Sequence, residues 1–150
     1  MVDMRVKNIG GYRRINAFVK AKLDKFNSME HSFSALYSLM FSEKDNIFFE
    51  KSVGYRIEKT TYGKCFDDIE RKAETLNSIL VDAQKNDVIG LFMENGAEWI
   101  ENFWTVLRAG YRPLLMNMRL SPSVLETALE NAGAKAVISD SAVFSLSIHS

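Results

Sequence analysis

Four carboxylates that follow one another closely are the first residues in this sequence that could do chemistry: Asp67, Asp68, Glu70 and Glu74. Residues three and four positions apart share one face of a helix, where carboxylates can bind a cation or exchange protons. Two cations, Arg71 and Lys72, are interleaved with them, and the group lies opposite an apolar stripe. The pattern therefore favours a solvated helix face over a metal or catalytic site.

The histidines and the cysteine predict no catalytic centre either. His31 and His149 are too far apart in the sequence to indicate a local metal or catalytic pair. Cys65 has only Lys64 beside it to lower the pKa of its thiol, so a half-buried packing role is expected. A single cysteine cannot form an internal disulfide, which suits a reducing compartment, and we expect a cytoplasmic protein.

A phosphate-binding loop and an aromatic platform are the remaining possibilities. The loop from Glu94 to Glu98 contains one glycine where a dinucleotide fingerprint has three, and its glutamates would repel phosphate. Trp99, Phe103 and Trp104 could stack on a ring, but aromatic residues on a helix that packs on a sheet normally fill the core. The residues by themselves therefore predict no catalytic, no cofactor-binding and no metal-binding residue.

The bulk composition narrows the class of protein. Nineteen basic and nineteen acidic residues cancel, so no overall field favours nucleic acid. The first eleven residues lack the apolar run of a signal peptide, and no segment approaches the length of a membrane span. With 47% apolar residues the chain can bury one core.

Hydrophobic periodicity places five helices and five strands along the chain. The helices are expected over Tyr12–Phe26, Ser32–Glu43, Tyr62–Ala83, Trp99–Leu107 and Ser121–Ala132. Two short strands, Ile47–Phe49 and Tyr55–Ile57, should form a hairpin around the link Ser52-Val53-Gly54. Three buried strands are expected at Asp87–Met93, Pro113–Met116 and Ala134–Ser139, and the pattern weakens from Asp140 onward.

Strands that alternate with helices predict the α/β class, with a parallel Rossmann-like sheet. We expect residues 1–31 to be an N-terminal amphipathic extension and residues 32–150 to be one α/β subdomain preceded by a helix and a short β-hairpin. The first helix has a basic face that could touch anionic lipid, although a solvated face is the simpler interpretation.

The order of specific motifs resembles the acyl-CoA synthetases and related adenylate-forming, AMP-binding enzymes. Thr61-Tyr62-Gly63 resembles the family's Thr-Tyr-x-Glu helix start, and Lys85-Asn86-Asp87 its Lys-Gly-Asp strand entry. The later matches are Met93-Glu94-Asn95 with Glu98-Trp99, Leu107-Arg108-Ala109-Gly110, Asn117-Met118-Arg119-Leu120-Ser121-Pro122 and Gly133-Ala134-Lys135. The resemblance runs from about Phe33 to Asp140, and chance does not explain so many motifs in the correct order.

Three local departures from the family pattern affect stability and not chemistry. Lys64 stands where a glutamate usually completes a capping box. Asn86 replaces a glycine, which is tolerable because asparagine enters the left-handed region more easily than most residues. Met118 replaces a proline and should loosen a turn.

The resemblance implies a ligase that acts in two steps. A carboxylate attacks ATP to form an acyl-adenylate and pyrophosphate, and the thiol of coenzyme A then displaces AMP; the whole enzyme would use ATP, Mg²⁺ and coenzyme A. The family holds the phosphates in a Ser/Thr/Gly-rich loop that ends in Pro-Lys-Gly, but the only serine-rich stretch here, Ser139–Ser150, has no glycine or lysine. We therefore expect an inactive N-terminal part of an acyl-CoA synthetase of fatty acid metabolism, which binds none of these cofactors alone.

Two alternatives remain open at this point. The chain could belong to a peptide-synthetase adenylation domain that loads a carrier protein, or it could be a non-catalytic α/β binding module. If it is part of a larger fold, its sheet would end in an unpaired edge, and self-association is expected.

Overall fold

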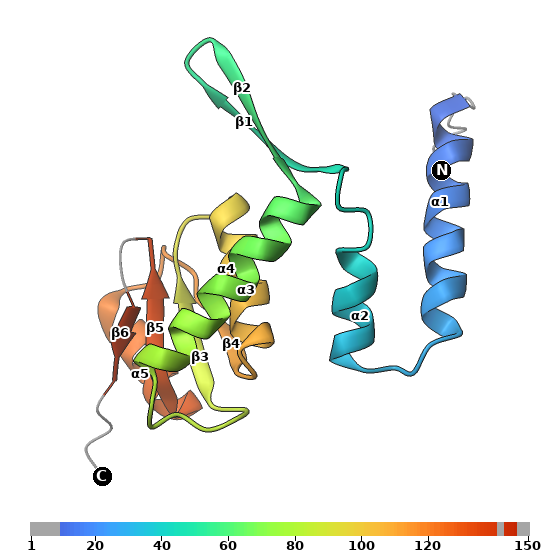
Figure 1. Ribbon diagram of the computed structural model, residues 1–150. Helices are drawn as coiled ribbons and strands as arrows, with labels where there is room; N and C mark the ends of the chain where they lie inside the picture. Colours follow the sequence, from blue (N-terminus) through green and yellow to red (C-terminus); the bar gives the residue numbers. More distant parts are fainter. Residues whose placement is uncertain (1–9, 141–142, 147–150) are drawn as a thin grey trace, which may run out of the picture. The chain divides into compact units, whose positions relative to one another are not determined.

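The computed structural model describes residues 10–140 and 143–146 of the chain (Figure 1). Contacts divide the chain into two compact units, Met1–Lys44 and Asp45–Ser150, and each is described by itself. The extension predicted for residues 1–31 remains a prediction, because a unit defined by contacts says nothing about family boundaries. The mixed α/β class predicted from the sequence is confirmed.

The first unit contains two helices, α1 (Gly10–Asn27) and α2 (Phe33–Met40). The Ser32 hydroxyl caps α2 by accepting a hydrogen bond from the Ala35 N–H at 3.2 Å, as predicted. The helix ends three residues earlier than expected, at Met40. Lys22 of α1 donates to Glu43 at 2.9 Å and to Ser42 at 2.5 Å, which ties the helix to the segment after α2.

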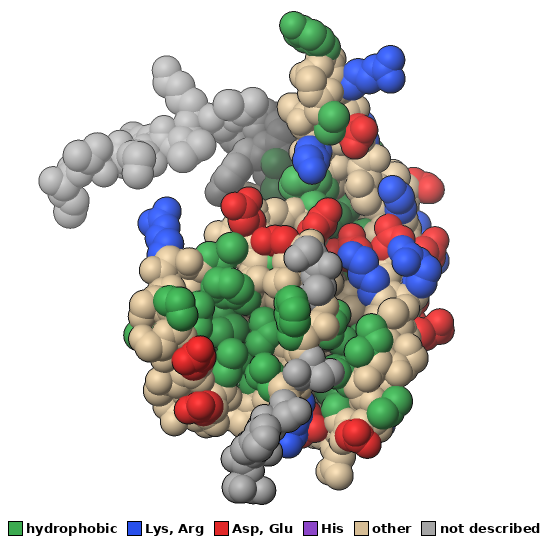
Figure 2. All heavy atoms as spheres, turned by 90° about the vertical axis from the view of Figure 1, so that its left-hand side faces the viewer, with side chains coloured by type: hydrophobic (Ala, Val, Ile, Leu, Met, Phe, Trp, Pro, Cys, Tyr) green, Lys and Arg blue, Asp and Glu red, His purple; other side chains and the backbone are tan. Residues whose placement is uncertain are grey.

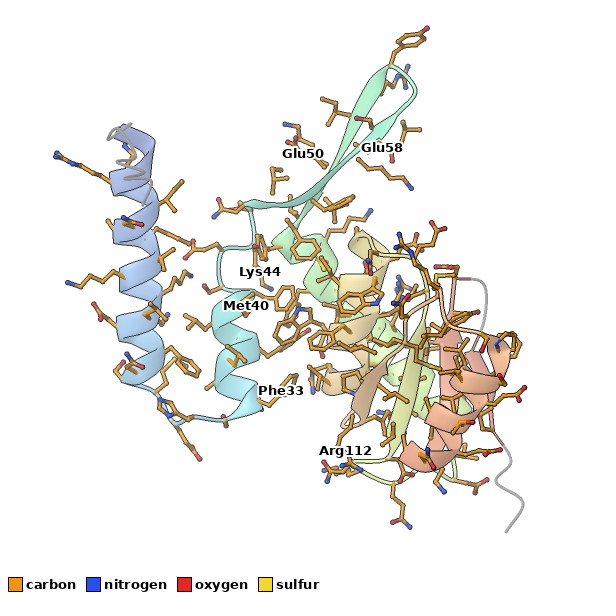
Figure 3. The ribbon with its side chains drawn as sticks, turned by 180° about the vertical axis from the view of Figure 1, so that it is seen from behind. Phe33, Met40, Lys44, Glu50, Glu58 and Arg112 are labelled. Carbon is orange, nitrogen blue, oxygen red and sulfur yellow. The ribbon has the colours of Figure 1, made fainter. Side chains whose placement is uncertain are left out.

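The second unit begins with an antiparallel hairpin of β1 (Ile47–Val53) and β2 (Arg56–Thr61). The predicted hairpin is present, but its strands are longer and its turn lies at Gly54 and Tyr55, because Val53 pairs with Arg56. Gly54 has a φ of 60°, which the tight turn requires. Glu50 and Glu58 lie on the two strands of this hairpin (Figure 3), and Lys59 pairs with Glu50 at 2.9 Å.

A four-stranded sheet forms the body of the second unit in the order β4-β3-β5-β6. Its strands are β3 (Val88–Phe92), β4 (Arg112–Leu115), β5 (Ala134–Ser139) and β6 (Val143–Ser145). The central strand β3 pairs in parallel with β4 and β5, as predicted. The sequence analysis missed β6, which pairs antiparallel to β5, because three residues carry too little periodicity to predict a strand.

Helices cover both faces of this sheet (Figure 1): α3 (Tyr62–Ile79), α4 (Ala97–Arg108) and α5 (Pro122–Ala132). On one face, Ile89 and Leu91 of β3 are fully buried in a core that α3 and α4 complete with Leu76 and Val106. The other face carries α5, in which no residue is fully buried. A Cβ atom at Gly90 would lie 3.1 Å from a methyl group of Leu129 of α5, so the helix approaches β3 closely at this residue.

The turn before β3 explains one departure from the family pattern. Asn86 has a φ of 70° and is the only described non-glycine residue with positive φ, which confirms that asparagine serves there in place of glycine. Its N–H donates to the Gly110 carbonyl at 2.8 Å, and the Arg112 guanidinium donates to its carbonyl at 2.6 Å. These bonds connect the start of β3 to the start of β4.

Cys65 is fully buried on α3, more deeply than the half-buried position expected. Burial raises the pKa of its thiol to about 12, and the nearby carboxylates of Glu101 and Asp68 add to that effect. A thiol that stays protonated is a poor nucleophile, so Cys65 acts in packing.

Substitution of Gly90 by valine should destabilise the second unit by about 1–3 kcal/mol, because the added Cβ alone would lie 2.9 to 3.3 Å from Met116, Leu129 and Val137, and valine adds two methyl groups to it. Urea unfolding followed by circular dichroism would measure the loss. Gly96→Ala is the matched control: Gly96 has extended backbone and no heavy atom within 4 Å of an added Cβ, so a change below about 0.5 kcal/mol is expected. Equal losses in the two variants would contradict this packing.

The Cys65 thiol should resist alkylation at pH 8 in the folded chain. A pKa of about 12 in place of the ordinary value of 9.0 lowers the thiolate fraction on the order of a thousandfold. The pKa of Cys65 is higher in the folded chain than in the unfolded chain. The contribution of its protonated thiol to the free energy of unfolding is therefore complete below pH 9 and disappears as the pH rises through 12. Unfolding midpoints at pH 8 and 10.5 should therefore differ more for the natural chain than for Cys65→Ala; identical pH dependence would contradict the shift.

Candidate functional site

A cavity of about 650 Å³ lies at the carboxyl ends of β3 and β4. Its apolar lining comes from five side chains: Met93, Trp99, Leu115, Met116 and Met118. Its polar lining comes from four more: Glu94, Asn95, Asn117 and Arg119. The sequence analysis named several of these residues in motifs but did not predict that the two segments enclose a cavity.

The topology of the sheet explains why the cavity forms at this edge. The chain leaves β3 toward α4 on one face of the sheet and leaves β4 toward α5 on the other. Loops that depart in opposite directions from neighbouring parallel strands leave a crevice between them, where open α/β sheets bind ligands. The site therefore follows from strand order and not from a local motif.

Hydrogen bonds hold the loops that border the cavity. The Glu94 N–H donates to the Asp140 carboxylate at 3.2 Å, which joins the ends of β3 and β5. The Asn117 side-chain oxygen accepts from the Arg119 N–H at 2.9 Å, and its carbonyl accepts from the Leu120 N–H at 3.1 Å. This turn is closed by Asn117 itself although Met118 stands where the family has proline.

The described residues do not fit the phosphates of ATP. Arg119 is the one cation in the lining, and Glu94 offsets its charge. The helix that begins at the cavity, α4, has Glu98 in its first turn, which opposes an anion at its N-terminus. Residues 10–140 and 143–146 contain no group of three or more His, Cys, Asp or Glu side chains that could hold a metal ion. The five apolar side chains of the lining instead suit the carbon skeleton of a ligand or an apolar packing partner.

Two of the four carboxylates named on α3, Asp68 and Glu70, form ion pairs. Asp68 accepts from Arg71 at 2.6 Å, while Asp67 and Glu74 are exposed. Glu70 receives two hydrogen bonds from Arg108 of α4, at 2.6 and 2.8 Å. The sequence analysis missed this partner because it lies 38 residues away and no local pattern indicates it.

Two of the three aromatic side chains predicted for the core differ in position. Phe103 packs on the core, whereas Trp99 lines the cavity. Their rings stack with centroids 5.8 Å apart, and Phe103 packs against the core of the second unit. Trp99 is only half-buried and lines the cavity, because it lies in the first turn of α4 at the sheet edge. Apolar spacing alone does not separate these two positions.

His31 is not one of the side chains that line this cavity. His31 belongs to the first unit, where it is exposed and its ring stacks on Phe26 at 4.9 Å. His149 lies outside the described residues. No helix in the described part of the chain is both long and apolar enough to cross a membrane.

Comparison with known proteins matches residues 42–148 to the model of the AMP-binding enzyme family. A curated relative, 4-hydroxybutyrate--CoA ligase 2 of Metallosphaera sedula, is 27% identical over 110 residues. That alignment covers 72% of this chain and 20% of the relative, so the chain spans about a fifth of that protein's length.

Solved structures of the same fold agree with this match. The O-succinylbenzoate coenzyme A synthetase MenE of Bacillus subtilis, in complex with AMP, superposes with a TM-score of 0.58 at 20% identity, over 75% of this chain and 27% of that one. The N-terminal subdomain of Klebsiella oxytoca NpsA gives 0.57 at 20% identity, over 76% and 27%. A fatty acyl CoA synthetase of Mycobacterium tuberculosis gives 0.50 at 26% identity, over 55% and 16%. With its α/β subdomain matched from residue 42 to residue 148, this chain belongs to the AMP-binding enzyme family.

Proposed function

We propose that this chain is the N-terminal part of an ATP-dependent acyl-CoA synthetase. The complete enzyme would join a carboxylic acid to AMP, release pyrophosphate, and transfer the acyl group to coenzyme A. The 27% identity to a curated CoA ligase supports the acid-thiol ligase class. ATP, Mg²⁺ and coenzyme A would serve the complete enzyme, and its expected location is the cytoplasm.

One observation carries the proposal: residues that match the family motifs occupy the turns on which this fold depends. Thr61 caps α3 by accepting from the Lys64 N–H at 3.2 Å. Asn86, Gly110 and Gly133 all have positive φ, at the entry to β3 and at the ends of α4 and α5. These residues follow one another along the chain in the order of the family motifs, and that order supports the proposal.

The role that the geometry supports for this chain is to position part of a binding site. The cavity offers an apolar wall with Trp99 and Met116 and a single cation, Arg119. The side chains that hold phosphates and complete the reaction would come from other segments of the enzyme. We therefore propose that the chain alone is inactive and binds none of the three cofactors.

Pyrophosphate exchange into ATP tests this proposal directly. The 150-residue chain should show no acid-dependent exchange above the blank with aliphatic, hydroxylated or aromatic carboxylic acids. A longer product of the same gene should show exchange with at least one acid and should form its CoA thioester. Exchange by the 150-residue chain would contradict the scaffold role, and transfer to a carrier-protein thiol but not to coenzyme A would favour a peptide-synthetase domain.

Apolar surface on the second unit leads to a further expectation, that the isolated chain self-associates. Figure 2 shows hydrophobic side chains gathered on the face that carries α5, β5 and β6, and Val124, Leu120 and Phe144 are each exposed by 43% or more. In the complete enzyme we expect other segments to cover this surface.

Sedimentation velocity should therefore show a species that grows with protein concentration, together with binding of an apolar dye. Val124→Lys should reduce both, because it places a charge in the apolar surface of α5. Ile57→Lys, on the exposed hairpin, is the matched control and should reduce neither. A clean monomer at high concentration without dye binding would argue against missing partner segments.

A further inference from the structure

Helix α1 of the first unit presents an apolar face to solvent. Ile15, Phe18, Val19 and Leu23 follow the three- and four-residue spacing of one helix face, and their side chains are 46–61% exposed. Four large apolar side chains exposed on one face of an 18-residue helix indicate a surface that contacts another apolar surface.

The charge on α1 differs sharply from that of the chain as a whole. Five cations and one anion lie on the helix: Arg13, Arg14, Lys20, Lys22, Lys25 and Asp24. The complete chain has nineteen charges of each sign, so α1 concentrates positive charge that the rest of the protein balances. This helix therefore generates a local attraction for an anionic surface although the protein is neutral overall.

Two cations stand at one border of the apolar face, and two more lie on the polar side of the helix. At 100° per residue, Arg14 and Lys25 fall on one border, and Arg13 and Lys20 fall beyond the other. Side chains of this length can extend sideways to anionic groups while the apolar face is buried. The arrangement is that of a helix lying in the plane of a lipid interface.

One cation, Lys22, lies within the apolar face, and it forms an ion pair with Glu43 of the same unit. The Lys22 ammonium is 2.9 Å from the Glu43 carboxylate and 5.3 Å from the centre of the Phe18 ring. Its charge is neutralised within the unit, so contact between the face and an apolar phase does not bury an unpaired charge.

We infer that α1 binds peripherally to the surface of an anionic lipid bilayer. A protein groove would use the apolar face but would not require the five cations of this helix, and nucleic acid would use the cations but not the apolar face. A bilayer with anionic headgroups uses both. α1 does not span the bilayer, because no helix of the described residues is long and apolar enough to do so.

Co-sedimentation of the full chain with vesicles tests this inference. Vesicles of phosphatidylcholine with phosphatidylglycerol should sediment the protein, those of phosphatidylcholine alone should not, and binding should weaken with added salt. Arg14→Gln with Lys25→Gln removes two border cations and should weaken partitioning about 25-fold, at roughly fivefold per cation. Phe18→Ser should weaken it independently of salt.

The matched control removes the same charge from the second unit, by Lys51→Gln with Lys64→Gln, and should leave vesicle binding unchanged. Circular dichroism of each variant confirms that helix content is kept; if Phe18→Ser loses it, Leu23→Ser is the substitute. Equal binding to neutral and anionic vesicles, an equal loss in the control, or binding to polyuridylate but not to vesicles would overturn the inference.

Discussion

The parallel pairing of β3 with both β4 and β5 is the constraint on which the second unit depends. β3 has a neighbour on each side and helices over each face, so its three central residues are buried. Ile89 and Leu91 fill one face, and Gly90 leaves the space that α5 needs on the other. Parallel strands require such coverage, which is why α3, α4 and α5 must all pack on this sheet.

The same pairing creates the candidate site. Because β3 and β4 are neighbours whose following helices lie on opposite faces, their loops separate and leave a cavity between them. The antiparallel strand β6 extends the sheet away from this point and does not alter it.

In the second unit, charged side chains form ion pairs between helices α3 and α4. Arg108 of α4 donates two hydrogen bonds to Glu70 of α3. The ammonium of Lys72 of α3 lies 2.5 Å from the carboxylate of Glu101 of α4. These pairs are partly exposed, so their individual contributions to stability are small, but their geometry sets how the two helices meet. On α1, by contrast, five cations and one anion accompany an apolar face, and the proposed bilayer contact rests on that combination.

The amino-acid sequence by itself determined most of the element types, the parallel character of the sheet that contains β3, β4 and β5, and the membership suggested by ordered motifs. Each depends on local periodicity or on turn chemistry, as the positive φ of Asn86 shows. Only the tertiary structure decided the position of the hairpin turn, the existence of β6, the Arg108 partner of Glu70, and the role of Trp99 at a cavity. These features arise between segments distant in the chain, where pairing register and helix packing select contacts that no local pattern encodes.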